Sequence, residues 1–258
     1  MKRFLFILTT AIAFAALPVA AQSYPYIDNS RPDKVLTFGL RAGLNSSGVT
    51  TNYLATQPDL IQSNYYWRMG GHFGAIADLH IRNFLAIEVG LSWENRGYDC
   101  SMMAANTAED YMGSTFVNNR YNYITIPTLL SFRLCLLKDA NLHFDIGTYY
   151  SYGVLGNKHM HSYIAFGAEE EQLIFDQTIT DTNYFEADPK DFLAVKRSDL
   201  GLQTGIGLTF FKHYFIGTYF KYSIKNNAKN REGSENHRLR NSSWSAVSYT
   251  HLTLPTIA

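Results

Sequence analysis

Strict alternation of apolar and polar residues limits the fold of this chain more than any other feature. In the stretch 36–45, LTFGLRAGLN, every even-numbered residue is apolar and every odd-numbered residue is small or polar. A period of two is that of a β-strand with one apolar face. The pattern recurs at 73–81, 85–93, 124–134, 142–152, 199–210 and 216–224, and an eighth strand begins near Asn241. The chain is therefore predicted to be all-β, which its 18 Tyr and 17 Phe also favour.

The stretch 72–94, HFGAIADLHIRNFLAIEVGLSWE, is predicted to be a hairpin. Its two apolar sets share one face if Ile81 lies opposite Leu85 across a tight turn. With this register the polar residues of the two arms also face one another, as the pairs Asp78 with Glu88 and His72 with Glu94.

The connections between the strands alternate between two sizes. Short ones lie near 82–84, 135–141 and 211–213, and long polar ones near 46–67, 96–120, 154–196 and 225–240. This alternation is typical of an outer-membrane barrel with short periplasmic turns and long extracellular loops. Strands of about 9–11 residues are long enough for a tilted span. We therefore predict an eight-stranded antiparallel up-and-down transmembrane β-barrel.

A soluble barrel with its apolar face inward would have the same period, so the glycines decide between the two. Those on the polar face are Gly39, Gly43, Gly74, Gly90, Gly147, Gly201, Gly205 and Gly207. In a narrow barrel interior, small residues make room for charged ones, whereas on a solvent face they would only weaken the strands. Aromatic residues near the strand ends are also typical of the interfacial girdles of a membrane barrel: Trp93, Tyr150, Tyr152, Phe210, Tyr214 and Tyr222.

The N-terminus indicates the compartment. Lys2 and Arg3 precede an apolar stretch at 4–16 and a small-residue cleavage site at 19–21, which predicts a secretory signal. We expect a signal peptide at 1–21, a periplasmic segment at 22–33 and a barrel at 34–246 in the outer membrane of a Gram-negative bacterium.

Charge and cysteine content exclude several classes of protein. Without Lys2 and Arg3 the chain has 20 basic and 22 acidic residues, which gives no electrostatic footprint for nucleic acid. Cys100 and Cys135 are too few for a disulfide framework or a four-ligand zinc site. We expect Cys100 in an outer loop and Cys135 at a periplasmic turn, not bridged.

Titratable residues gather on the polar face of the predicted strands: Arg41, His72, Asp78, His80, Glu88, Glu94, Arg133, His143, Asp145, Asp199 and Lys221. One interpretation is a metal or acid–base site in the 72–94 hairpin. However, His72 and His80 lie about 26 Å apart along one strand at ~3.3 Å per residue, so they cannot share a metal ion. We therefore expect an interior ion-pair network, without catalytic residues, metal or cofactor. The two facing carboxylates are expected to have an arginine beside them, either Arg41 or Arg133.

Two long loops offer other chemistry. The loop 225–240 is basic and is expected to contact lipopolysaccharide phosphates or the acidic loop 154–196, through Lys225, Lys229, Arg231, Arg238 and Arg240. In the loop 154–196, His159, His161 and Ser162 are the candidates for a lipid-modifying enzyme, but spacing fixes no carboxylate beside them.

Four stretches, FGLRAGLN, GGHFGAIADLHIRNFLAIEVGLSWENRG, YNYITIPTLLSFRL and SDLGLQTGIGLTF, resemble in order and spacing the PorT-like outer-membrane β-barrel family of Bacteroidetes. The resemblance covers nearly all of the chain after the signal and implies an eight-stranded barrel. A founding relative is associated with secretion of surface proteins, whereas most members have no defined activity.

The C-terminus departs from the pattern of this family. Such barrels usually close with a strand that ends in an aromatic residue, whereas this chain ends SAVSYTHLTLPTIA. That tail resembles a translated sequencing-adapter read-through. We therefore expect residues 247–258 to be non-native and the last strand to be truncated or artefactual.

The sequence thus predicts a non-enzymatic integral outer-membrane protein with a charged, plugged interior and a structural or surface-interaction role. The alternatives are an accessory to protein secretion across the outer membrane, a narrow solute pore and a lipid-modifying enzyme. The expected partners are outer-membrane lipid, including lipopolysaccharide, and a secretion-system or surface protein.

Overall fold

The computed structural model describes residues 25–53, 59–106, 111–137, 139–166, 173–188, 193–211, 213–230 and 237–252. The expected signal peptide lies outside these ranges. The described residues form one short 3₁₀ helix, η1 (Tyr184–Glu186), and nine strands: β1 (Leu36–Thr51), β2 (Leu60–Arg82), β3 (Leu85–Asn106), β4 (Tyr111–Leu137), β5 (Ala140–Phe166), β6 (Leu173–Asp181), β7 (Ser198–Phe210), β8 (Tyr214–Ser223) and β9 (Leu239–Leu252). Among them no helix is both long enough and apolar enough to cross a membrane.

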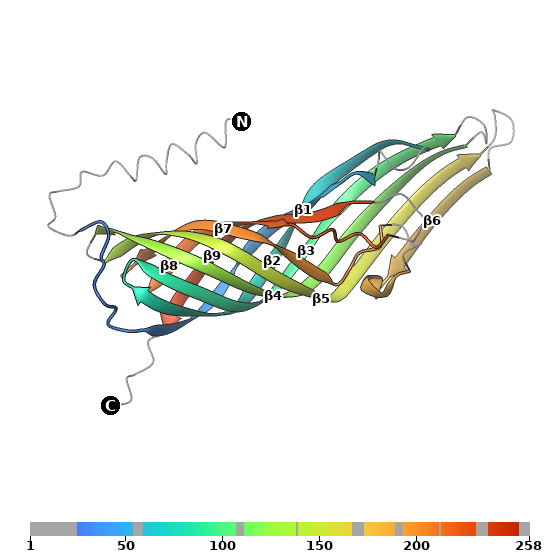
Figure 1. The fold of residues 1–258 in the computed structure, drawn as a ribbon. Helices are drawn as coiled ribbons and strands as arrows, with labels where there is room; N and C mark the ends of the chain where they lie inside the picture. Colours follow the sequence, from blue (N-terminus) through green and yellow to red (C-terminus); the bar gives the residue numbers. More distant parts are fainter. Residues whose placement is uncertain are drawn as a thin grey trace.

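Eight of the strands close into a ring. They pair in the order β4-β3-β2-β1-β9-β8-β7-β5, and pairing of β4 with β5 completes the ring. All of these pairs are antiparallel, so the prediction of an eight-stranded antiparallel barrel is confirmed (Figure 1). β6 lies outside the ring and pairs with the outer half of β5, from Lys158 to Phe166.

Strands β2 to β5 are far longer than the span that we expected. They have 22 to 27 residues each, and beyond the ring they continue as an open sheet that ends in β6 (Figure 1). Residues 46–51, 60–67, 96–106, 111–120, 154–166 and 173–181 are therefore strand, and the prediction of long loops over these ranges is wrong. Beyond the lipid no apolar outer face is required, so the alternation fades while the backbone ladder continues.

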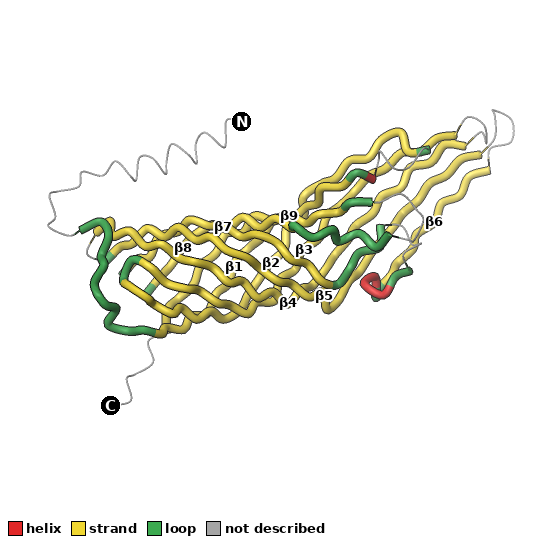
Figure 2. The backbone as a smooth tube through the Cα atoms, viewed as in Figure 1, coloured by secondary structure: helices red, strands yellow, loops and turns green. Residues whose placement is uncertain are grey.

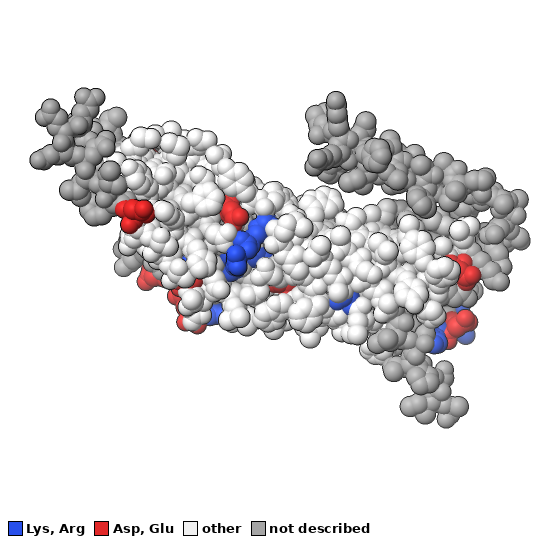
Figure 3. Space-filling view, turned by 180° about the vertical axis from the view of Figure 1, so that it is seen from behind, with Lys and Arg blue, Asp and Glu red and all other residues white. Residues whose placement is uncertain are grey.

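The side chains of the ring are arranged with their apolar face outward. Leu40, Phe73, Leu91, Ile146 and Leu202 are exposed on the outer surface, whereas the charged residues of the same strands are buried inside. On the side shown in Figure 3, charged side chains are sparse over the barrel body and gather mainly towards its two ends. This arrangement is that of a barrel surrounded by lipid.

The 72–94 hairpin has the predicted register over most of its length. Asp78 pairs with Glu88, and His72 pairs with Glu94. At the turn, however, Arg82 rather than Ile81 pairs with Leu85, across a register shift. An extra residue in β2 thus forms a bulge that the sequence analysis did not predict, as is common at the rims of barrels.

Beyond the ring the inner face of the sheet changes from charged to apolar. Tyr98, Cys100 and Met102 continue the even-numbered inward face of β3 and are buried with residues of β4. Two segments pack against them, one before β7 and one between β8 and β9, through Tyr184, Phe185, Leu193, Ala194, Val195 and Ala228. Cys100 therefore lies in β3 and not in a loop, and Cys135 lies in β4 just before the turn and not in the turn itself. Both cysteines are free thiols.

The N-terminal segment runs across the turn end of the barrel (Figure 2). Its backbone carbonyls accept hydrogen bonds from the β2–β3 turn and from β4: Phe84 N donates to Asp28 O at 3.2 Å and Cys135 N to Tyr26 O at 2.9 Å. The segment is thereby fixed to two hairpins at once.

The last strand extends past the boundary that we expected at residue 246. Residues 247–252 lie in β9 and pair with β1 and β8, and Val247 and Tyr249 are buried inside the ring. Residues 253–258 lie outside the described part of the chain.

Candidate functional site

Near the turn end of the barrel, an arginine of β4 reaches across the interior to an aspartate and a histidine of β2. Arg133 Nη2 donates to Asp78 Oδ2 at 2.9 Å, and its Nη1 lies 3.0 Å from His80 Nδ1. His143 lies in the same region, with its Nε2 atom 2.7 Å from Thr209 Oγ1. Asp78 has no exposed surface, so its charge is compensated by the arginine rather than by water.

The next layer joins β1 to β3. Arg41 Nη2 lies 2.5 Å from Glu88 Oε1, and the guanidinium carbon of Arg41 lies 4.9 Å from the ring centre of Tyr219. The hydroxyl of Tyr219 donates to Asp145 Oδ2 at 2.7 Å. Because Asp78 pairs with Arg133, both facing carboxylates have an arginine of their own.

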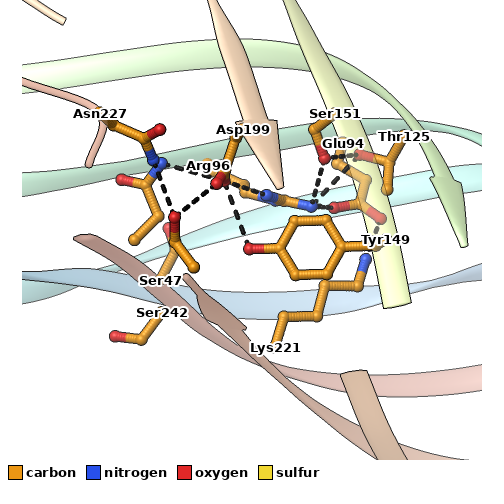
Figure 4. A network of polar contacts seen from close by, with 12 residues as sticks. Ser47, Glu94, Arg96, Thr125, Tyr149, Ser151, Asp199, Lys221, Asn227 and Ser242 are labelled. Carbon is orange, nitrogen blue, oxygen red and sulfur yellow. Dashed lines mark hydrogen bonds and ion pairs between the residues drawn. The ribbon is translucent and has the colours of Figure 1, made fainter. Parts of the chain in front are cut away.

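Arg96 of β3 occupies the centre of the third layer (Figure 4). It forms an ion pair with Glu94 and lies 3.4 Å from Asp199 Oδ2. Lys221 contacts the other oxygen of Glu94. Hydroxyl groups fill the remaining hydrogen-bonding positions around Arg96 and Asp199, from Thr125, Ser151, Tyr149 and Ser223.

Arg96 is absent from the residues that the sequence analysis selected. Arg96 falls in the predicted loop 96–120, because the alternation of apolar and polar residues ends at Trp93. The pattern could have predicted Arg96 as an interior residue, because it continues the even-numbered, inward-facing series of Glu88 and Glu94. Inward-facing tyrosines were also missed, because tyrosine was assigned to the outer girdles.

His72 lines a small cavity in the middle of the barrel, with room for about one water molecule. Arg41, Glu94, Gln203, Tyr219 and Lys221 also line this cavity. The structure does not bring His72 and His80 together, because seven residues of β2 lie between them. Among the described residues, no group of three or more His, Cys, Asp or Glu side chains is arranged to hold a metal ion.

Charged side chains of the protein itself fill the interior of the barrel in these three layers. Four cationic side chains, Arg41, Arg96, Arg133 and Lys221, meet five carboxylates, Asp78, Glu88, Glu94, Asp145 and Asp199. Buried charges of this kind are tolerated only when they are paired and hydrogen-bonded. The arrangement suits mutual neutralisation and closure of the barrel better than it suits binding of a solute.

The short helix η1 packs against β4 and β5 where these strands leave the ring. The ring of Phe185 in η1 lies against Gly153 and Gly156 of β5, where an added Cβ on Gly153 would be 2.2 Å from its Cζ atom. The ring also contacts Tyr121 and Tyr123, at centroid distances of 5.3 and 5.6 Å. The two glycines thus provide the space that this aromatic side chain occupies.

The basic residues of 225–240 do not form one surface. Lys229 Nζ donates to the carbonyl oxygens of Phe185 and Ala187, at 2.8 Å each, and so holds η1 in place. Lys225 is exposed and lies 2.5 Å from Ser198 Oγ, and Arg238 is exposed. Arg240 is half-buried in β9, and Arg231 lies outside the described residues.

The candidates for a lipid-modifying enzyme lie in strand β5 and not in a loop. His161 and Ser162 are consecutive, so their side chains point to opposite faces of the sheet. His161 Nε2 lies 2.8 Å from Asp176, whereas Ser162 Oγ lies 3.1 Å from Thr115 Oγ1. His159 contacts Thr180. The three residues therefore do not form a nucleophile–base pair.

The closed ring, its apolar outer wall and its charged interior together define an integral outer-membrane β-barrel. The family of outer membrane protein beta-barrel domains matches residues 20–229, and the chain belongs to this family. It is therefore an outer-membrane β-barrel protein of a Gram-negative bacterium.

Several solved outer-membrane barrels are similar to this chain. Ail, the attachment invasion locus protein of Yersinia pestis, is 13% identical, with a TM-score of 0.38 over 84% of this chain and 98% of Ail. OprG of Pseudomonas aeruginosa is 9% identical, with a TM-score of 0.42 over 90% of this chain and 100% of OprG. Neisserial surface protein A is 8% identical, with a TM-score of 0.32 over 83% of this chain and 96% of its own. A search of curated proteins found no match.

Proposed function

We propose that this protein is a non-conducting, non-enzymatic barrel that anchors an extracellular sheet in the outer membrane for a structural or surface-interaction role. The observation that carries the proposal is the third interior layer, in which Arg96 joins Glu94 and Asp199 inside the ring. A permeating ion would have to displace these contacts, which are buried and mutually compensating.

The extended strands support the second half of the proposal. A barrel that served only as a membrane plug would need spans of about 9–11 residues. Here four neighbouring strands are 22 to 27 residues long, and their outer halves have an apolar core of their own. A sheet that packs its own core outside the membrane is a rigid platform for contacts with other molecules.

Conductance in a planar lipid bilayer tests closure. The full-length protein should show no steady open channel after insertion. Insertion should be verified by a heat-modifiable shift on a gel. A variant with Arg96→Ser, Glu94→Ser and Lys221→Ser provides the positive control, because it removes the central layer and should conduct. A steady channel in the unmodified protein would favour the narrow pore instead.

A role as an accessory to protein secretion is the second candidate. It is favoured by the resemblance of four sequence stretches to the PorT-like family, including YNYITIPTLLSFRL on β4 and SDLGLQTGIGLTF on β7. Deletion in the native host should then abolish export of surface proteins. Normal export would exclude an essential role in secretion.

Lipopolysaccharide is the partner that we propose for the basic residues after β8 that are exposed or half-buried. Lys225, Arg238 and Arg240 would contact its phosphates, whereas Lys229 is occupied by η1. Neutralising these three side chains should weaken partitioning into lipopolysaccharide-containing vesicles, and unchanged partitioning would remove this contact from the proposal.

A further inference from the structure

The outer face of the sheet has a cationic cluster on strands other than β8 and β9. It consists of Arg68 of β2, Asp99 of β3, and Asn118 and Arg120 of β4. Arg68 Nη1 lies 3.4 Å from Asp99 Oδ1 and 3.1 Å from Asn118 Oδ1. Asn118 Nδ2 donates to the same Asp99 oxygen at 2.7 Å. One carboxylate thus compensates one of two arginines.

Glycine brings the two arginines together. Gly97 pairs directly with Arg120, and opposite residues in an antiparallel pair have Cβ positions about 4.5–5.5 Å apart. The Cδ atom of Arg68 lies 3.2 Å from where a Cβ on Gly97 would be. The stem of Arg68 therefore crosses the bare backbone at Gly97, next to the base of the Arg120 side chain.

Arg120 provides the uncompensated charge. Its side chain is exposed, and no ion pair or hydrogen bond to it is seen among the described residues. Because Asp99 is already engaged by Arg68 and Asn118, the cluster has a net charge of +1 at neutral pH. An exposed guanidinium is a planar fork of donors that matches a phosphate group in geometry.

The height of the cluster fits the headgroup layer. Ile124 of β4 pairs with Trp93 and Tyr152, which belong to the predicted aromatic girdle. Arg120 is four residues further out on the same face of the strand, or ~13 Å along the chain. A strand tilt of 35–45° reduces this to ~10 Å above the girdle. A long arginine side chain can extend back towards the interface from that height.

We infer that Arg120, with Arg68 beside it, binds a phosphate group of the glycolipid in the outer leaflet. The cluster lies on β2, β3 and β4, and β1 separates β2 from β9 in the ring. It is therefore a site separate from Lys225, Arg238 and Arg240. The inference does not depend on whether the barrel conducts.

The test uses the full-length protein in detergent micelles and measures lipid binding by native mass spectrometry. The probes are purified lipopolysaccharide, the same glycolipid after enzymatic removal of its phosphates, and phosphatidylglycerol. Arg120→Gln is expected to weaken lipopolysaccharide binding about three- to tenfold, the effect of losing one charge-assisted contact at a partly hydrated surface. The unmodified protein should bind the dephosphorylated glycolipid at least as weakly as Arg120→Gln binds lipopolysaccharide.

Arg82→Gln is the matched control, because Arg82 is also exposed but lies at the turn end of β2. It should bind lipopolysaccharide like the unmodified protein. A heat-modifiable gel shift should confirm that both variants are folded. Equal binding by Arg120→Gln and the unmodified protein would overturn the inference. Equal binding of the dephosphorylated glycolipid or of phosphatidylglycerol would also overturn it, because the site would then not select a phosphorylated glycolipid.

Discussion

Arg41 of β1 and Glu88 of β3 form an ion pair across the barrel interior, with Nη2 2.5 Å from Oε1, although β2 lies between their strands. Glu88→Gln would leave the guanidinium buried without its counter-charge. We expect it to lower the free energy of unfolding by about 3–5 kcal/mol. Urea titration of the protein in lipid vesicles measures this change.

The double variant Arg41→Met with Glu88→Met is the control for that prediction. Replacing both members of a buried pair by apolar residues of similar volume is often neutral. Most of the lost stability should therefore return. If Glu88→Gln were as stable as the unmodified protein, the pair would not hold the interior together.

Gly153 is predicted to be essential for the packing of Phe185 against β5. A methyl group at this position would lie 2.2 Å from Cζ of Phe185, so Gly153→Ala should expel the ring. Limited proteolysis of intact vesicles should then cut the chain around η1 faster. In a Phe185→Ala background the same substitution should have little further effect, because the clash is gone. Additive effects of the two changes would contradict this account.

Lys229 is predicted to hold η1 against the sheet. Lys229→Met removes two hydrogen bonds from a charged donor to the Phe185 and Ala187 carbonyls, each worth about 1.5–3 kcal/mol. Amide hydrogen exchange at Ala187, whose N–H donates to Tyr184 O, should become at least about tenfold faster. Lys225→Met, at an exposed position, should leave that rate unchanged. Equal rates in the two variants would refute the role of Lys229.

The barrel itself was predictable because lipid outside and charge inside impose opposite requirements on neighbouring residues. That alternation marks seven strands of the ring, for example Leu40 outside next to Arg41 inside, whereas in β9 the apolar Val247 and Tyr249 lie inside. It also fixed the pairing of Asp78 with Glu88. The bulge near Ile81 was not predictable, because one extra residue at a strand end leaves no trace in the pattern.

The outer halves of β2 to β5 were not predictable from the same pattern. Tyr98 and Cys100 face an apolar core, whereas Asp99 and Asn118 lie on the opposite, half-exposed face. Neither face lies in the hydrocarbon layer of the membrane, so the apolar residues switch from the outer face to the inner face along one strand. Arg96 lies where the apolar residues change face. It was not predicted as an interior residue, because this part of β3 was predicted to be a loop.

Docking of the N-terminal segment is predicted to depend on pH through Asp28. Hydrogen bonds from Ser30 and from Asn83 lower the pKa of this carboxyl below its ordinary value of 3.8. A lowered pKa stabilises the docked state above pH 3.8, and this contribution is lost as the pH falls below that value. A spin label at Asp33→Cys, in a background with both native cysteines replaced by Ser, should therefore become more mobile near pH 3 than at pH 6.

Asp28→Asn is the control for this prediction. It keeps the shape of the side chain but has no proton to gain, so the mobility of the label should not change across that range. A label that stayed equally immobile in the unmodified segment at pH 3 would show that Asp28 does not hold the segment in place.

The reaction of a cysteine at the barrel centre with a small thiol reagent shows whether the interior is closed. Ser92 is buried and lines the central cavity. In vesicles, Ser92→Cys in a background without native cysteines should not react with a water-soluble methanethiosulfonate unless the protein is unfolded in urea. Thr182→Cys, at an exposed position after β6, should react at once. Rapid modification of the folded Ser92→Cys protein would show that solutes reach the interior and would contradict the account.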